Sequence, residues 1–264
     1  EYLDREIPVV LTLILSVPEE TGIDTNAVSE GEATLGSLQQ ITSGFYDDEL
    51  ARLAAAVAAD GRPIIIRPLH EGDGDWYRWG MYAEGNTVED YVAAFAHVVE
   101  VFRTANAPVE FELNLNRRDG ASPPGVMTDI ETWFLGLDPY VDVYSISSYN
   151  RCKTNATAYQ DWRSFTTEFE PAYTALAAKT TKPINVAEVA TADFCGPKLP
   201  WYVNMVSDIE DKFPQVEMIT FYFGTVPVGA ASNDVPIEWG FPTDSQIEAF
   251  ATVIKLWREH FAHE

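Results

Sequence analysis

Short apolar segments alternate with amphipathic segments along most of this chain of 264 residues. Each apolar segment stays hydrophobic through several consecutive positions, which is typical of strands buried on both faces of a parallel sheet. Six segments have this character, and we predict strands at Pro8–Leu15, Pro63–Pro68, Val109–Leu115, Val141–Ser147, Ile184–Val189 and Met218–Phe223.

The intervening segments repeat hydrophobic residues at helical spacing. The segment 87–105 places Tyr91, Phe95 and Phe102 on one face, as an amphipathic helix requires. The segment 47–60 begins with acidic residues, which stabilise the first turn of a helix. We predict helices at 47–60, 87–105, 164–180, 201–213 and 244–261.

Repeating strand–helix units predict an α/β protein with a parallel sheet, either doubly wound or closed as a (β/α)8 TIM barrel. No glycine-rich phosphate loop follows a predicted strand, and GEATLG at 31–36 has no strand before it. Polar and aromatic residues instead follow several strands, as they do at the mouth of a barrel. We therefore favour the barrel, as a single domain over residues 1–264, although only six strong strands are present.

The charge and hydropathy of the chain indicate which kinds of molecule it binds. The formal net charge of −24 repels nucleic acid, anionic lipid and polyanionic substrates, so a neutral substrate fits better. Asp and Glu are scattered along the chain, which is typical of a solvated surface. The longest apolar run, at 7–15, is shorter than the ~20 residues that span a membrane, and we expect no membrane partner.

The stretch PIIIRPLHEGDGDWYRWG at 63–80 carries the candidate chemistry. Glu71 follows one predicted strand, and Glu188 lies within or just after another. A carboxylate at the end of a buried strand costs free energy unless it is hydrogen-bonded or functional. One such residue is more often a member of an ion pair, but two that face one mouth fit the paired carboxylates of glycoside hydrolysis.

Aromatic residues fit the same chemistry. Flat apolar faces on which sugar rings could stack are offered by Trp76, Tyr77, Trp79, Tyr82 and Trp239. For any single one of the seven tryptophans, core packing is an equal alternative. Carboxylates and aromatics together predict a site for a neutral carbohydrate.

The motif RPLHEGDGDWYRWG resembles the acid/base segment of glycoside hydrolase family 26, a family of (β/α)8 barrels that includes many β-mannanases. The resemblance is carried by Arg67, His70, Glu71, Gly74, Trp76, Trp79 and Gly80. VDVYSISSYN (141–150) and KPINVAEVA (182–190) are similar to later strands of that family, so the likeness extends from about Ile41 onward. It implies that Glu71 ends barrel strand four and that strands one and two lie upstream of Glu1.

The resemblance also implies roles for the site residues. Glu71 would be the acid/base and Glu188 the nucleophile of a retaining hydrolysis, in which Tyr149 donates a hydrogen bond to Glu188. Apart from the resemblance, we expect Arg67 to hold Glu188 ionised. The residues expected to contact substrate or position these carboxylates are Arg67, His70, Trp76, Trp79, Tyr149, Tyr222 and Trp239.

Two positions depart from the family pattern. Asp73 stands where Asn is common, and the last predicted strand offers Tyr222 or Phe223 where a Trp platform is usual. We expect an endo-β-1,4-mannanase. A β-1,3-1,4-glucanase, a β-1,3-xylanase, a non-catalytic carbohydrate-binding barrel and a barrel with both carboxylates in ion pairs stay open. No metal or other cofactor is expected, because His70 and Glu71 lack the second His of an H-E-x-x-H motif.

Cys152 and Cys195 each follow a predicted strand by a few residues. In the barrel that the resemblance implies, the loops after these strands are neighbours, and a disulfide would tie the rim of the mouth. Two buried thiols are the alternative. A disulfide fits a secreted or extracytoplasmic protein, and we expect a monomer.

Overall fold

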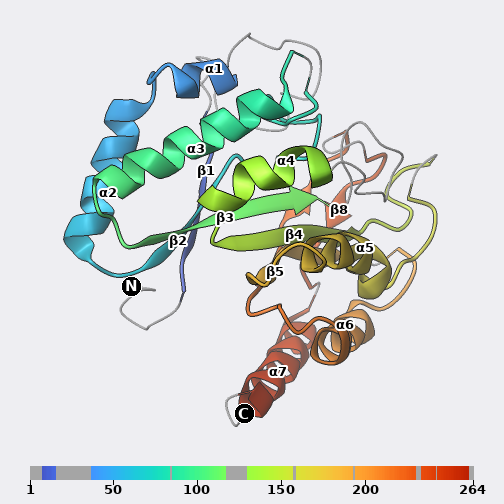
Figure 1. The fold of residues 1–264 in the computed structure, drawn as a ribbon. Coiled ribbons are helices and arrows are strands. Elements are labelled where there is room, and N and C mark those ends of the chain that lie inside the picture. Colours follow the sequence, from blue (N-terminus) through green and yellow to red (C-terminus); the bar gives the residue numbers. More distant parts are fainter. Residues whose placement is uncertain are drawn as a thin grey trace.

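The computed structural model describes residues 8–15, 37–83, 85–116, 130–156, 159–192, 194–229, 233–241 and 243–261. Six parallel strands form a curled sheet with helices on its outer side (Figure 1). These strands are β1 (Val10–Leu13), β2 (Ile64–Pro68), β3 (Val109–Asn116), β4 (Val143–Asn150), β5 (Ile184–Thr191) and β6 (Ile219–Phe221). A short antiparallel pair, β7 (Thr225–Val226) and β8 (Ile237–Glu238), lies apart from this sheet.

Helices alternate with the strands of the sheet. They are α1 (Ser37–Thr42), α2 (Asp47–Asp60), α3 (Val88–Thr104), α4 (Ile130–Leu137), the 3-10 helix η3 (Asp138–Tyr140), α5 (Phe165–Ala177), α6 (Lys198–Lys212) and α7 (Asp244–Phe261). The strands are ordered β1 to β6 without reversal, whereas a doubly wound sheet reverses its strand order at a switch point. The barrel class is therefore confirmed, with six of its parallel strands among the residues described.

The predicted strands and helices are all present, with their ends moved by a few residues. β4 continues to Asn150, because the Asn150 carbonyl accepts from the Ala192 amide and its side chain donates to Thr191. Helix α4 was not predicted from the sequence, although its buried residues Ile130, Trp133, Phe134 and Leu137 have helical spacing. This helix is only eight residues long, so its pattern is easily mistaken for an apolar loop.

Local chemistry fixes the helix ends that lead into the site. α2 carries three acidic residues in its first turn, which complement the positive end of the helix dipole. Gly61 ends it in the left-handed conformation, with its amide bonded to the Val57 carbonyl, an arrangement that suits glycine. Thr87 caps α3 by accepting from the Asp90 amide, which satisfies one free N–H of the first turn.

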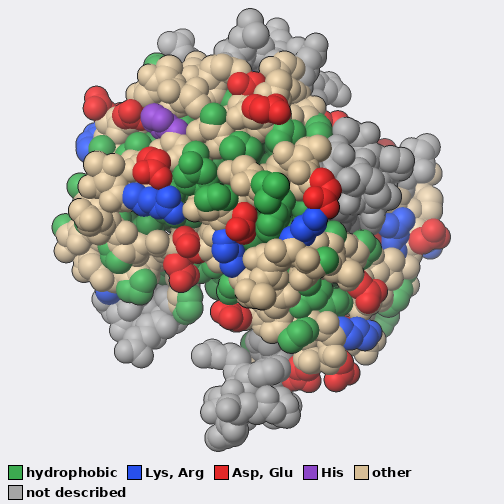
Figure 2. Space-filling model, in the orientation of Figure 1, with side chains coloured by type: hydrophobic (Ala, Val, Ile, Leu, Met, Phe, Trp, Pro, Cys, Tyr) green, Lys and Arg blue, Asp and Glu red, His purple; other side chains and the backbone are tan. Residues whose placement is uncertain are grey.

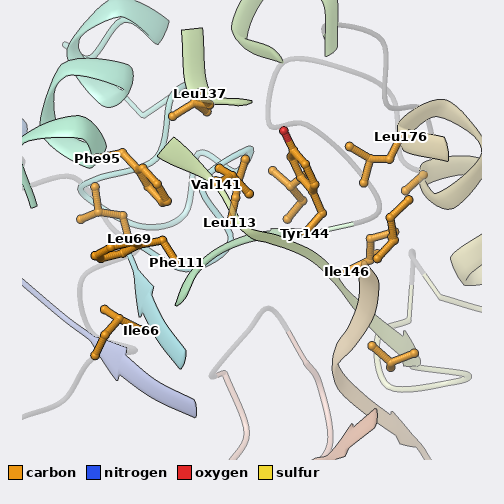
Figure 3. Close-up of a cluster of buried hydrophobic side chains, with 14 of the residues drawn as sticks. Ile66, Leu69, Phe95, Phe111, Leu113, Leu137, Val141, Tyr144, Ile146 and Leu176 are labelled. Atoms are coloured by element: carbon orange, nitrogen blue, oxygen red, sulfur yellow. The ribbon is translucent and has the colours of Figure 1, made fainter. Parts of the chain in front are cut away.

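The main hydrophobic core lies between the sheet and the helices that cover it. Figure 3 shows Ile66, Phe111 and Ile146 from the strands facing Phe95 of α3 and Leu176 of α5, and all five are almost completely buried. Burial of this apolar surface holds the outer helices against the sheet. The core therefore fixes the strand ends, where the polar residues lie.

The surface agrees with the scattered charges of the sequence. On the face in Figure 2, Asp and Glu side chains are spread among other groups without forming a single patch. No helix in the described part of the chain is long and apolar enough to cross a membrane.

The loops that follow β4 and β5 are joined covalently. Cys152 and Cys195 form a disulfide, with their Cα atoms 6.1 Å apart. The predicted pairing is confirmed. The bond links two loops at the end of the sheet where the strands carry Tyr149 and Glu188.

We expect the double substitution Cys152→Ser/Cys195→Ser to lower the free energy of unfolding. The cross-link spans 43 residues, for which the loss of unfolded-chain entropy stabilises the folded state by about 4 kcal/mol. Denaturant unfolding with and without reductant measures this effect. The double variant serves as the control, since reductant should not change its unfolding midpoint. If reductant also leaves the midpoint of the unsubstituted chain unchanged, the prediction is contradicted.

Candidate active site

The register of three neighbouring strands brings the two glutamates to one place. Asn116 of β3 pairs with Ser147 of β4, and Ser147 pairs with Glu188 of β5. Glu71 lies just beyond β2, and its Oε1 accepts from Asn116 Nδ2 at 2.8 Å. A row of polar side chains thus runs from Glu71 through Asn116 and Ser147 to Glu188.

Glu71 is buried and is held by uncharged donors. Trp76 Nε1 donates to Glu71 Oε2 at 2.8 Å, while Asn116 donates to the other carboxyl oxygen, Oε1. Burial raises the pKa of the Glu71 carboxyl, and the nearby Glu188 carboxylate raises it further. Hydrogen bonds from Trp76, Asn116 and Ser147 act in the opposite direction without cancelling the rise. Glu71 therefore favours its protonated form more than an exposed glutamate does.

Glu188 has a different environment. Its Oε2 accepts a 2.6 Å hydrogen bond from the Tyr149 hydroxyl, and its Oε1 lies 3.8 Å from Arg67 Nη1. Burial and the Glu188 charge raise the pKa of Tyr149 well above its ordinary value, so that Tyr149 remains a donor. Glu188 thus faces a strong hydrogen-bond donor and a cation.

Arg67 itself is fixed mainly by a residue that the sequence analysis did not select. Its Nη2 lies 2.8 Å from Oε1 of Glu112, and its Nε donates to the same oxygen at 3.0 Å. Both side chains are almost fully buried. The closer partner of Arg67 is therefore Glu112, and Glu188 shares the remaining side of the guanidinium.

His70 lies beneath the site among aromatic rings. Its ring centroid is 4.6 Å from that of Tyr77 and 5.2 Å from that of Trp79. Burial, and then the charge of Arg67, lower the pKa of His70 to about 4. The ring is thus neutral at neutral pH and adds no positive charge beside Glu71.

The backbone around Glu71 is strained and firmly held. Leu69 and Glu71 have φ angles of 52° and 50°, in the left-handed region that residues other than glycine seldom occupy. The Tyr91 hydroxyl donates to the Leu69 carbonyl at 2.9 Å, and Trp79 Nε1 donates to the His70 carbonyl at 2.8 Å. The Glu71 amide donates to Asn114 Oδ1 at 3.0 Å. These bonds fix the direction in which Glu71 leaves the chain.

Gly72 is required by the same arrangement. A Cβ atom at this position would lie 2.1 Å from the Tyr91 hydroxyl oxygen, which is far closer than van der Waals contact allows. The absence of a side chain lets Tyr91 of α3 reach the turn beneath Glu71.

The predicted aromatic residues divide into two groups. Trp76 is partly exposed and bonded to Glu71, and Tyr222 is 37% exposed with its ring 6.0 Å from that of Tyr149. Trp79 and Trp239 are only 4% and 3% exposed. Trp79 stacks on Tyr77, and Trp239 packs against Tyr149. The expectation of open stacking faces is therefore wrong for these two tryptophans, because neighbouring protein covers their rings.

Several residues of the site were not among the predicted site residues. Glu112, Asn114 and Asn116 alternate with apolar residues in β3, so they share one face of the sheet. Such alternation inside a buried parallel strand is unusual and could have marked this face as polar. Ser147 and Tyr91 gave no comparable signal. In the described ranges, no group of three or more His, Cys, Asp or Glu side chains could hold a metal ion.

The chain is similar to a known protein family and to known sequences. The model of glycosyl hydrolase family 26 matches residues 33–220. Endoglucanase H of Acetivibrio thermocellus is 38% identical over 182 residues, which are 67% of this chain and 19% of that protein. Mannan endo-1,4-beta-mannosidase A and B of Caldalkalibacillus mannanilyticus is 26% identical over 210 residues, covering 80% of this chain and 35% of that protein. The chain thus matches about a third or less of the length of these two relatives.

Solved structures share the fold. The GH26 beta-mannanase BoMan26A from Bacteroides ovatus has a TM-score of 0.63 at 16% identity, over 95% of this chain and 69% of that chain. A modular endo-beta-1,4-mannanase from Cellulomonas fimi has a TM-score of 0.56 at 18% identity, over 87% of this chain and 52% of that one.

We expect Tyr91→Phe to lower the turnover of a reaction that uses Glu71, because it removes the hydroxyl that holds the strained turn below Glu71. The change should reduce kcat roughly tenfold with little effect on KM, since small displacements of a reacting group are costly. Tyr144→Phe is the matched control, because Tyr144 is equally buried and donates to Asp138 at 2.9 Å, away from the site. Each variant should lose about 1 kcal/mol of stability, but kcat should fall in Tyr91→Phe alone; full turnover in that variant contradicts the positioning role.

We expect Asn116→Ala to raise the pKa of Glu71 further, because the lost hydrogen bond favours the ionised carboxylate. A reaction that needs protonated Glu71 is active below this pKa and loses activity as the pH rises through it. The alkaline limb of the kcat/KM profile should therefore move to higher pH, even if the maximum rate falls. A limb that stays in place or moves to lower pH would show that this bond does not control Glu71.

Proposed function

This chain belongs to glycosyl hydrolase family 26, and from that premise we propose that it cleaves a β-linked neutral polysaccharide with retention of anomeric configuration. In this proposal, residues 1–264 act as one monomeric catalytic domain that needs no cofactor. Glu71 is the acid/base and Glu188 is the nucleophile.

The observation that carries the proposal is the unequal environment of the two glutamates. Glu71 meets the uncharged donors Trp76 and Asn116 and has a raised pKa, whereas Glu188 meets Tyr149 and the charge of Arg67. A carboxyl group that favours its protonated form, beside a carboxylate that faces a cation, is what an acid and a nucleophile require.

The reaction then has two steps. The Glu188 carboxylate attacks the anomeric carbon while the bond to the leaving oxygen breaks, and Glu71 gives its proton to that oxygen. Glu71, now ionised, takes a proton from water, whose oxygen attacks the anomeric carbon and releases Glu188 from the ester. Tyr149 and Arg67 stabilise the charge that returns to Glu188.

We propose β-1,4-mannan, cleaved within the chain, as the substrate. Two of the curated relatives are named mannan endo-1,4-beta-mannosidases, from Caldalkalibacillus mannanilyticus and Bifidobacterium adolescentis. A β-glucan is the second candidate, because the relative with the higher identity is named endoglucanase H. The exposed Tyr222 replaces the Trp platform expected at this strand, and a changed platform is compatible with a different sugar.

We propose a secreted or extracytoplasmic location. The disulfide between Cys152 and Cys195 persists in oxidising compartments and is rare in reducing ones. The acidic composition agrees with a neutral glycan as the extracellular substrate.

Assays on β-1,4-mannan, mixed-linkage β-glucan and β-1,3-xylan test the proposal. We expect cleavage of mannan, and a loss of several orders of magnitude in Glu71→Ala and in Glu188→Ala without loss of fold. Proton NMR of the first product should show the β-anomer. Full activity of Glu188→Ala, or first formation of the α-anomer, would refute the retaining mechanism, and cleavage of glucan alone would replace the proposed substrate.

A further inference from the structure

The two loops joined by the disulfide each expose a large aromatic side chain. Trp162 follows β4 and is 43% exposed, and Phe194 follows β5 and is 40% exposed. A single exposed hydrophobic residue is common on protein surfaces. What distinguishes these two is their place on adjoining loops at one end of the sheet.

Hydrogen bonds attach both loops to the strand ends beside the proposed active site. The Arg163 amide, next to Trp162, donates to Asn150 Oδ1 at 3.1 Å, and the Asn150 side chain donates to Thr191 at 2.9 Å. Thr191 ends β5, three residues beyond Glu188, or about 10 Å along an extended strand. Trp162 and Phe194 thus belong to loops at the end of the sheet where Glu188 lies, and both come after the strand ends.

The backbone near Trp162 is supported from below. Trp201 of α6 donates from Nε1 to the Arg163 carbonyl at 2.8 Å. A Cβ at Gly196 would lie 3.5 Å from Trp162 Nε1, so the edge of the indole rests on a glycine, and no side chain at that position covers it. The disulfide at Cys195, the next residue, limits the separation of the two loops. The exposed ring therefore belongs to a braced surface.

We propose that Trp162 and Phe194 form an outer sugar-binding site, which holds a neutral sugar unit of the polysaccharide remote from the bond that is cleaved. The inference rests on the proposed hydrolase function and extends it to substrate length. Aromatic rings bind the apolar faces of sugars by stacking and need no charge. The net charge of −24 disfavours an acidic polymer at this surface. Because the site is remote, it increases the affinity for long chains and leaves short ones unaffected.

The turnover of mannohexaose and of mannotriose compares a long substrate with a short one. Cello-oligosaccharides of the same lengths serve if glucan is the substrate. We expect Trp162→Ala to lower kcat/KM for the hexaose roughly tenfold, the effect of losing one stacking contact, and to leave the triose unchanged. Phe194→Ala should act in the same direction, and Trp162→Phe should recover most of the loss because it restores a ring. Leu135→Ala is the control, since Leu135 is exposed on the outer helix α4.

A second readout separates this inference from the function beneath it. Calorimetric titration of mannohexaose and of cellohexaose into the Glu188→Ala chain, with and without Trp162→Ala, measures binding without turnover. Weaker binding in the double variant supports the outer site, whether or not the unsubstituted chain hydrolyses a glycan. If the unsubstituted chain hydrolyses none, only the hydrolase proposal is refuted. Equal losses for short and long substrates, or unchanged hexaose turnover and binding, would overturn the outer site while leaving the hydrolase proposal in place.

Discussion

One buried guanidinium lies between two carboxylates, and the properties of the site follow from how its charge is shared. Arg67 contacts Glu112 at 2.8 Å and lies 3.8 Å from Glu188. Glu71 instead meets the neutral donors Trp76 and Asn116. An ionised carboxylate buried without a cation is costly, which agrees with the raised pKa of Glu71. The proposed division between nucleophile and acid is therefore a consequence of where a single positive charge lies.

The fold provides this arrangement through strand register and a strained turn. Asn116, Ser147 and Glu188 share a row of the sheet, and a shift of one residue in any of these strands would turn its side chain to the other face. The turn beyond β2 holds Leu69 and Glu71 at positive φ. Strain of this kind persists where surrounding contacts determine the conformation, and here Tyr91, Trp79 and Asn114 supply them.

The sequence predicted the parts of the structure that depend on local pattern. The strands were recognisable from apolar runs, and Glu71 from a motif whose residues are adjacent in the chain. Glu112 could have been found, because it alternates with Asn114 and Asn116 on one face of β3. Its pairing with Arg67, 45 residues away, depends on the register between β2 and β3, which single-strand patterns do not contain. The burial of Trp239 likewise depends on Tyr149 from a distant segment, whereas Trp79 is covered by Tyr77 of its own motif.

The most direct test of the account is the pKa of the Glu71 carboxyl, measured by carbon NMR titration of the unsubstituted chain and of Glu188→Gln. We predict a pKa above the ordinary glutamate value of about 4.3, and a decrease when the charge of Glu188 is removed, since that charge helps to raise it. An ordinary pKa that is the same in both proteins would contradict it, because Glu71 would then be ionised at neutral pH and unable to act as the acid.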